Sequence, residues 1–265
     1  MNGQESGIAA INAGVPQGSI LGPTLFLAFI NDLAESMENN IDLFADDTTL
    51  SAVIRNCKNK EVVIRSLQSD LENVTSWAKK WIVTFNAKKT QVMTISRKRD
   101  KTNDFPLSFC GEQLEETNCI KLVGINITNS LNWGYHADKV AMRSGQRLGI
   151  IRRARRLLPV SALASLYKSK VRSVMEYCSP IWQGASKSTL GKLDVIQRKA
   201  TRCMGYHGDC IPDFHIFKLE QRRKVSGGCQ LYRMMFNIAP SAVCNLLPPI
   251  SVPQKNSQAV NSCHH

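Results

Sequence analysis

The chain has 265 residues, of which 43% are hydrophobic and 21% are charged, so a packed core is expected and wholesale disorder is excluded. The formal net charge of +13 predicts an acidic partner such as nucleic acid or an anionic membrane. Nine irregularly spaced cysteines, with no signal peptide before them, predict an intracellular protein with reduced thiols, and no apolar stretch is long enough for a membrane-spanning helix.

The basic and acidic residues are unevenly distributed along the chain. Residues 1–50 contain seven acidic residues and no Lys or Arg, and all 34 basic residues follow them. This pattern suits a cation-binding centre followed by a surface that binds polyphosphate. The alternative is a charged face that only contacts solvent.

Hydrophobic periodicity predicts mixed secondary structure in the first half of the chain. We expect a weak strand at 3–13, a helix capped by Ser19 at 19–37, a hairpin at 41–53 and a second helix at 60–81. Three short strands are predicted after them, at 91–96, 106–114 and 120–127. After Trp133 the pattern becomes helical and basic. The predicted helices there are 136–158, 160–178 and 187–204, with breaks at Pro159 and Pro180.

The predicted hairpin carries Asp46 and Asp47 at its tip. Magnesium prefers hard oxygen ligands, and two such ions can activate a hydroxyl and stabilise the leaving oxygen in phosphoryl transfer. Because side chains alternate along a strand, the two carboxylates cannot point equally into one site, and a third carboxylate from another strand is needed. The alternative is an ordinary turn, in which Asp is common.

A second motif stands upstream of this hairpin. The string Gly14-Val-Pro-Gln17-Gly18-Ser19-Ile-Leu-Gly-Pro23 precedes Phe44-Ala45-Asp46-Asp47. Glycines let a backbone approach a nucleotide closely, and Gln17 and Ser19 offer hydrogen bonds to it. The alternative for this string is a Gly/Pro turn that begins a helix.

Together these two strings resemble the reverse transcriptase family, specifically its non-LTR (LINE-type, jockey-like) retrotransposon branch. The resemblance implies that the first string contacts template and incoming nucleotide, and that the second is the catalytic hairpin of the palm. The implied catalytic and metal-binding residues are Asp46 and Asp47, and the implied substrate-binding residues are Gly14, Gln17, Gly18, Ser19, Phe44 and Ala45.

Later strings fit the same branch in the expected order. After Trp77-Ala-x-x-Trp81, the string Phe85-Asn86-x-x-Lys89-Thr90 implies that Lys89 protonates the pyrophosphate leaving group. Leu122-Val123-Gly124 resembles the turn that grips the primer end. Thumb and post-thumb elements are implied by Trp133-x-x-His136, Tyr177-Cys178-x-x-Ile181-Trp182 and Leu219-Glu220-x-Arg222-Arg223.

The basic helices predict a phosphate-binding surface. Arg152, Arg153, Arg155 and Arg156 fall within five residues, and spacings of about four place Arg143, Arg147 and Arg152 near one helix face. Such a face can neutralise phosphates of a template–primer duplex without reading its sequence. The alternative is a solvated helix surface.

A possible zinc site comprises Cys203, His207, Cys210 and His215. Zinc accepts Cys and His ligands in tetrahedral sites. The spacing C-x3-H-x2-C-x4-H matches no established zinc knuckle, and a chance cluster is the alternative.

One part of the family's palm has no counterpart here. The family has a further metal-binding aspartate in a strand of the type F-x-D-x-x-x-A-F-D before the glycine loop, and the 13 residues before Gly14 do not match it. We therefore expect an incomplete two-magnesium site and no polymerase activity from this chain alone. The family's fingers, with their basic residues for the incoming triphosphate, also have no counterpart here. Apolar palm surface is therefore expected to be exposed, including part of the 19–37 helix.

The sequence thus predicts an α+β fold. A partial polymerase palm of antiparallel strands and helices is expected at 1–130, a basic helical thumb at 131–205, and a helical carboxyl-terminal extension with a frayed tail at 206–265. The predicted function is RNA-directed DNA polymerase, with an RNA template, a DNA primer and deoxynucleoside triphosphates as partners and no membrane. The alternatives are a non-catalytic nucleic-acid-binding remnant and a group II intron maturase or telomerase-like protein.

Overall fold

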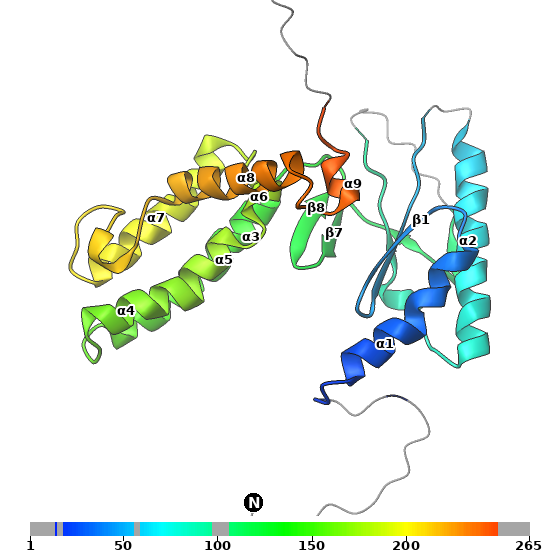
Figure 1. Cartoon of the computed structure of the whole chain (residues 1–265), viewed down its shortest axis with the longest axis horizontal. Coiled ribbons are helices and arrows are strands. Elements are labelled where there is room, and N and C mark those ends of the chain that lie inside the picture. The colour runs from blue at the N-terminus through cyan, green and yellow to red at the C-terminus, as the bar shows by residue number, and fades with distance from the viewer. Residues whose placement is uncertain (1–13, 15–17, 56–58, 97–105, 249–265) are drawn as a thin grey trace, which may run out of the picture. The chain divides into compact units, whose positions relative to one another are not determined.

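The computed structural model describes residues 14, 18–55, 59–96 and 106–248. The chain forms two compact units, Met1–Ile120 and Lys121–His265 (Figure 1). Both helices and strands are present, which agrees with the predicted α+β class. No helix within the described residues is both long and apolar enough to cross a membrane.

The first unit begins with two short helical segments. The predicted helix over 19–37 is divided into α1 (Gly22–Ile30) and a 3₁₀ helix, η1 (Asn31–Ser36). The N-cap residue of α1 is Leu21, without a side-chain cap, so the prediction that Ser19 is the cap is wrong in position. The Ser19 hydroxyl nevertheless accepts a hydrogen bond from the Gly22 amide at 2.9 Å. Leu21, Leu25 and Leu27 are each more than half exposed, so the expected exposure of apolar residues on this helix is confirmed.

A hairpin and a long helix follow. Strands β1 (Asn40–Phe44) and β2 (Asp47–Ser51) pair antiparallel, which confirms the predicted hairpin. Helix α2 (Lys60–Trp81) has the predicted bounds, because its apolar positions recur at helical spacing and face the core. It ends at Ile82, which takes a left-handed conformation with φ 56°.

The remaining strands of this unit are two-residue pairs. A 3₁₀ turn, η3 (Ala87–Lys89), precedes them, and the strands are β3 (Gln91–Val92), β4 (Ser108–Phe109), β5 (Glu112–Gln113) and β6 (Glu115–Glu116). β4 pairs antiparallel with β5, whereas β3 pairs parallel with β6, so the prediction of only antiparallel strands is wrong at this pair. Within the described residues the strands form separate two-stranded sheets and no continuous palm sheet.

The core of the first unit lies between α2 and the segments on either side of it. Leu33, Leu71 and Val74 are buried together with Trp77 and Phe109. The Phe29 and Trp77 rings pack edge to face at 5.6 Å, and Phe85 and Phe109 do so at 5.8 Å. The first contact packs α1 against α2, and the second packs the segment after α2 against β4.

The second unit begins within the first strand of a hairpin and is otherwise helical. Its elements are β7 (Cys119–Leu122), β8 (Ile125–Thr128), α3 (Gly134–Ala154), α4 (Val160–Leu166), the π-helix η4 (Tyr167–Arg172), α5 (Ser173–Glu176), α6 (Ser179–Trp182), α7 (Lys187–Cys203), the 3₁₀ turn η5 (Pro212–Phe214), α8 (Leu219–Met235) and α9 (Ser241–Cys244). The three predicted basic helices are therefore confirmed as helical, and the second of them runs through a π-helical turn.

The core of the second unit is formed mainly by α3, the α4–α5 run and α7. Tyr167, Trp182 and Leu193 are fully buried in it. The Tyr167 hydroxyl donates to the Gln197 side chain, whose amide in turn donates to the Phe217 carbonyl at 2.9 Å. This network satisfies buried polar groups and ties α7 to the loop after it.

The division between Ile120 and Lys121 precedes the boundary that the sequence predicts near residue 130. The assignment of palm, thumb and extension to 1–130, 131–205 and 206–265 stays a prediction.

Candidate functional site

The aspartate hairpin presents its two acids at a tight loop. Because Phe44 pairs with Asp47, only Ala45 and Asp46 form the connection between β1 and β2. Ala45 has φ 52°, a conformation that L residues rarely adopt, so the backbone of this turn is locally strained. Both carboxylates are exposed to solvent, and Phe44 beside them is 61% exposed.

A buried carboxylate on α2 anchors the base of the same hairpin. Asp70 is fully buried and accepts hydrogen bonds from the Glu38 amide at 2.8 Å and from the Asn39 amide at 3.0 Å. The Asn39 side chain also donates to Asp70 at 2.8 Å and to Ser66 at 2.6 Å. These contacts hold the two residues that directly precede β1, and the sequence reading missed them.

The hairpin supplies oxygen donors of the kind that magnesium prefers. The carboxylate oxygens of Asp46 and Asp47 are suitable ligands for such an ion, but two exposed carboxylates do not complete its coordination shell. Among the residues that the structure describes, no group of three or more His, Cys, Asp or Glu side chains is placed to hold a metal ion. The two carboxylates of the hairpin thus stand outside any such group in the described part of the chain.

The glycine loop lies only partly within the described residues. Gly14 and Gly18 have φ values of 92° and 86°, and a Cβ atom at either position would meet no atom of the described residues within 4 Å. The conformation therefore favours glycine, while the space around it stays open. Gln17, which the sequence predicts to contact substrate, lies outside the described residues.

Lys89 is placed at the end of the η3 turn. The Asn86 side chain accepts a hydrogen bond from the Lys89 amide at 3.2 Å and so caps this turn. The side chains of Lys88 and Lys89 are both exposed. Exposure leaves Lys89 accessible to a substrate, but it does not distinguish Lys89 from its neighbour.

The predicted primer-grip turn, Leu122 to Gly124, lies in the second unit. Val123 and Gly124 have φ values of 45° and 82°, the pattern of a two-residue hairpin turn of type I′. The Tyr177 hydroxyl donates to the Val123 carbonyl at 3.0 Å, and a Cβ atom on Gly124 would lie 3.5 Å from the Tyr177 ring. Tyr177, noted in the sequence only as part of a motif, therefore braces this turn.

A buried histidine supports the strand that follows the turn. The His136 Nδ1 atom accepts a hydrogen bond from the Asn126 amide at 3.2 Å, and the imidazole packs edge to face on Trp182. Burial, and secondarily the charge of Arg143, lowers the pKa of His136 below its ordinary value of 6.5. His136 is therefore neutral at physiological pH and acts as a hydrogen-bond acceptor.

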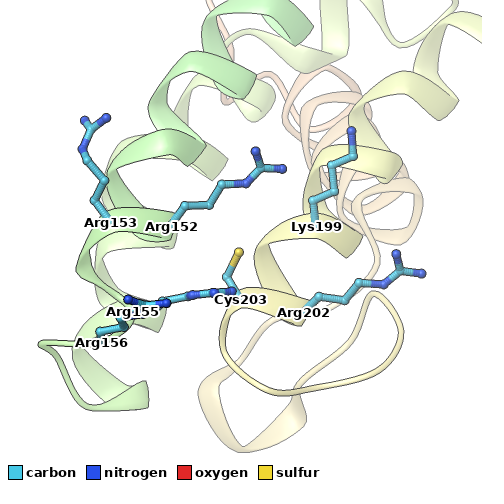
Figure 2. Close-up of a pocket in the computed structure, with 7 residues that line it drawn as sticks. All are labelled: Arg152, Arg153, Arg155, Arg156, Lys199, Arg202 and Cys203. Atoms are coloured by element: carbon cyan, nitrogen blue, oxygen red, sulfur yellow. The ribbon is translucent and has the colours of Figure 1, made fainter.

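The predicted phosphate-binding arginines are separated into two groups. Arg152, Arg153, Arg155 and Arg156 line a hollow of about 660 Å³ together with Lys199, Arg202 and Cys203 of α7 (Figure 2). Arg143 and Arg147 do not line it, and Arg147 donates instead to the Lys170 carbonyl at 3.0 Å. The proposed common face for Arg143, Arg147 and Arg152 is therefore not seen, because a helical step of five residues from Arg147 turns Arg152 well away from it.

The four residues of the possible zinc site do not assemble within the described chain. Cys203 lines the basic hollow, whereas His215 is exposed in a left-handed conformation after the η5 turn. Ile211 and Ile216 form a β-bridge around this turn and are buried. Local hydrophobic packing thus accounts for the shape of this loop.

Comparison with known proteins gives one consistent set of relatives. Residues 1–127 match the reverse transcriptase (RNA-dependent DNA polymerase) family. The chain is 27% identical over 270 residues to the RNA-directed DNA polymerase from mobile element jockey of Drosophila melanogaster, covering 95% of this chain and 29% of that protein.

Two further relatives agree with this assignment. A probable RNA-directed DNA polymerase from transposon BS of Drosophila melanogaster is 29% identical over 73% of this chain and 22% of its own length. The jockey polymerase of Drosophila funebris is 30% identical over 76% of this chain and 23% of its own length. The chain thus spans less than a third of these curated relatives, and no solved structure gives a significant match.

Proposed function

Because the chain is a homologue of the RNA-directed DNA polymerases of non-LTR retrotransposons, we propose that it contributes the palm's aspartate hairpin to RNA-templated DNA synthesis. The observation that carries this proposal is the exposed pair formed by Asp46, in the two-residue hairpin loop, and Asp47, the first residue of β2. The buried anchor at Asp70 supports it, because phosphoryl transfer needs carboxylates at fixed positions.

In the proposed reaction, a primer 3′-hydroxyl attacks the α-phosphate of a deoxynucleoside triphosphate. One phosphodiester bond forms and pyrophosphate leaves. Magnesium, when bound, would lower the charge repulsion between phosphates and attacking oxygen. Asp46 is the proposed principal ligand, Asp47 supports it, and Lys89 gives a proton to the leaving pyrophosphate.

The other predicted contacts complete the proposal for substrate binding. Gly14, Gln17, Gly18 and Ser19 would line the nucleotide and template pocket beside Phe44 and Ala45. The turn at 122–124 would hold the primer end, and its Tyr177 brace would fix the backbone there. The template is RNA and the primer is DNA in this reading.

A chimera tests this function directly. The chain would replace the aligned segment of the Drosophila melanogaster jockey polymerase, and primer extension on an RNA template would be measured. We expect extension that Asp46→Asn abolishes and that Asp42→Asn leaves intact, since Asp42 is exposed on the same hairpin away from its loop. Lys89→Ala should slow extension, whereas Lys88→Ala should not. A folded chimera in which Asp46→Asn retains full extension would contradict the proposal.

The 265-residue chain alone is expected to show no primer extension, because two carboxylates do not complete the two-metal site. Robust extension by the purified chain, lost on Asp46→Ala, would show that the two acids suffice.

A second candidate function is nucleic-acid binding without catalysis, which the basic hollow on α3 and α7 favours. The two candidates place different demands on Asp46, because binding tolerates Asp46→Asn and catalysis does not.

A further inference from the structure

Helix α8 packs beside a sharp bend of the chain in the second unit (Figure 1). The bend lies between α5 and α6, where Tyr177 leaves the helical conformation and Cys178 takes the left-handed one with φ 50°. The buried Trp182 indole donates to the Tyr177 carbonyl at 2.9 Å and so closes the bend. The Tyr177 side chain is thus carried by a bend that a buried residue stabilises.

On the α5 side, α8 holds Glu176, the residue directly before the bend. Arg222 donates from Nε and Nη2 to the two carboxylate oxygens of Glu176, the second at 3.0 Å. Such paired hydrogen bonds fix direction as well as distance. The Arg222 and Glu176 side chains are 35% and 23% exposed, so water screens this pair less than a surface pair. Arg172 approaches the same carboxylate to 3.8 Å, so two guanidinium groups hold Glu176.

On the other side of the bend, α8 lies close to the end of α6. A Cβ atom on Gly227 would lie 2.5 Å from the Gln183 Nε2 atom, so the lack of a side chain at Gly227 leaves room for Gln183 against the helix. Gln183 directly follows α6, and its amide donates to the Ser179 carbonyl at 2.8 Å. Because Arg222 and Gly227 contact residues that flank the bend, α8 restrains it from both sides.

The Tyr177 side chain connects this bend to the turn at 122–124. Its hydroxyl donates to the Val123 carbonyl at 3.0 Å, and Tyr177 is 49% exposed, so core packing alone does not fix its ring. Val123 has φ 45°, which is strained for a β-branched residue and persists where surrounding contacts enforce it. The turn therefore depends on Tyr177, and the position of Tyr177 depends on the bend that α8 restrains.

We propose that Arg222 and Glu176 are positioning residues for the primer end, because α8 sets the backbone position of the turn at 122–124 through Tyr177. The inference rests on the proposed function of this turn, and it places neither side chain in contact with substrate. The expected effect is on binding of the primer end rather than on phosphoryl transfer. A role is thereby assigned to the string Leu219-Glu220-x-Arg222-Arg223, which the proposed function leaves unused.

Hydrogen–deuterium exchange of the 265-residue chain tests this link without catalysis. Arg222→Gln should raise exchange of peptides covering 121–128 about tenfold, since the lost pair is intermediate between an exposed and a buried ion pair. The matched control is Lys224→Gln, which removes the same charge from the same helix by breaking the exposed pair with Glu220. It should leave exchange at 121–128 within about twofold. Unchanged exchange in α3 and α7 would show that the unit folds in both variants.

A double-mutant cycle determines whether Arg222 acts through Tyr177. Tyr177→Phe removes the hydroxyl that donates to Val123 but keeps the ring, and it should also raise exchange at 121–128. If Arg222 acts through this hydroxyl, the double variant should exchange no faster than the faster single variant. Independent effects of about tenfold each would instead multiply to about 100-fold.

The chimera with the Drosophila melanogaster jockey polymerase tests the consequence for primer use. Arg222→Gln and Tyr177→Phe should each raise the KM for the primer–template about tenfold and leave kcat within about twofold, as expected when binding is lost and chemistry is not. Lys224→Gln should change neither constant. Asp46→Asn should abolish extension without changing exchange at 121–128, so failure of the polymerase proposal and failure of this one give different results.

Three results would overturn the inference. They are unchanged exchange at 121–128 in Arg222→Gln, multiplied effects in the double variant, and a loss of kcat with an unchanged KM for the primer–template.

Discussion

The substitution Asp70→Asn should destabilise the base of the aspartate hairpin while leaving the residues of the hairpin themselves unchanged. The carboxylate accepts two backbone amides and one side-chain amide from Glu38 and Asn39, and it is fully buried. An Asn side chain keeps one acceptor oxygen but turns an NH₂ group toward the remaining donors. Buried donors are then left without an acceptor, so the hairpin base becomes less stable relative to its opened state.

The expected cost follows from the number of donors affected. Hydrogen bonds to charged groups contribute about 1.5–3 kcal/mol each, and an unsatisfied buried donor costs about 1–3 kcal/mol. Since Asn retains part of the network, we expect a loss of about 2–4 kcal/mol. The exposed Glu72→Gln on the same helix is the matched control and should cost less than about 0.5 kcal/mol.

Hydrogen–deuterium exchange measures this loss where it occurs. A cost of 2 kcal/mol raises the exchange rate of locally opening amides about 30-fold. The increase should cover peptides from Asn39 to Ser51 and spare α3 and α7 of the other unit. If exchange in this hairpin stays within about threefold of the unmodified chain, Asp70 does not hold the hairpin and the reasoning fails.

Two further predictions concern the rest of the fold. Ile82→Gly should stabilise the first unit by about 1 kcal/mol, as measured by urea unfolding, because a β-branched residue is strained at φ 56°. Ile82 is 90% exposed, so its side chain contributes little packing. A loss of stability in this variant would refute the prediction. His136 has a lowered folded pKa, so its stabilisation is fully present above the unfolded value of 6.5 and is lost as the pH falls through the folded pKa. The free energy of unfolding should therefore fall as the pH falls from 6.5 to the folded pKa, by at most about 1.4 kcal/mol per pH unit. His136→Gln should flatten this pH profile. An unchanged slope in this variant would contradict the assignment of the pH dependence to His136.

Local patterns predicted the elements whose signal is contained in a short stretch of chain. The bounds of α2 follow from helical spacing within 60–81, and the β1–β2 hairpin follows from a short β-favouring segment that Asp46–Asp47 divides. The possible zinc site was proposed from residue type and spacing alone. Neither property indicates the Ile211–Ile216 bridge that shapes the loop. The pairing of β3 with β6 also escaped prediction, because parallel partners distant in sequence leave no local mark.

The residues that support the predicted site could not be predicted from the sequence for a related reason. Asp70 lies 31 residues from Asn39, and Tyr177 lies 54 residues from Val123, so neither contact has a sequence signature. The arginine run was visible, but its partners on α7 were not. In each case the sequence predicted residues that would face a substrate, and the structure adds the residues that hold them in place. Substitutions at Asp70 and Tyr177 should therefore affect position and rigidity, whereas substitutions at Asp46 should affect chemistry, and exchange and primer-extension measurements on the same variants can separate the two effects.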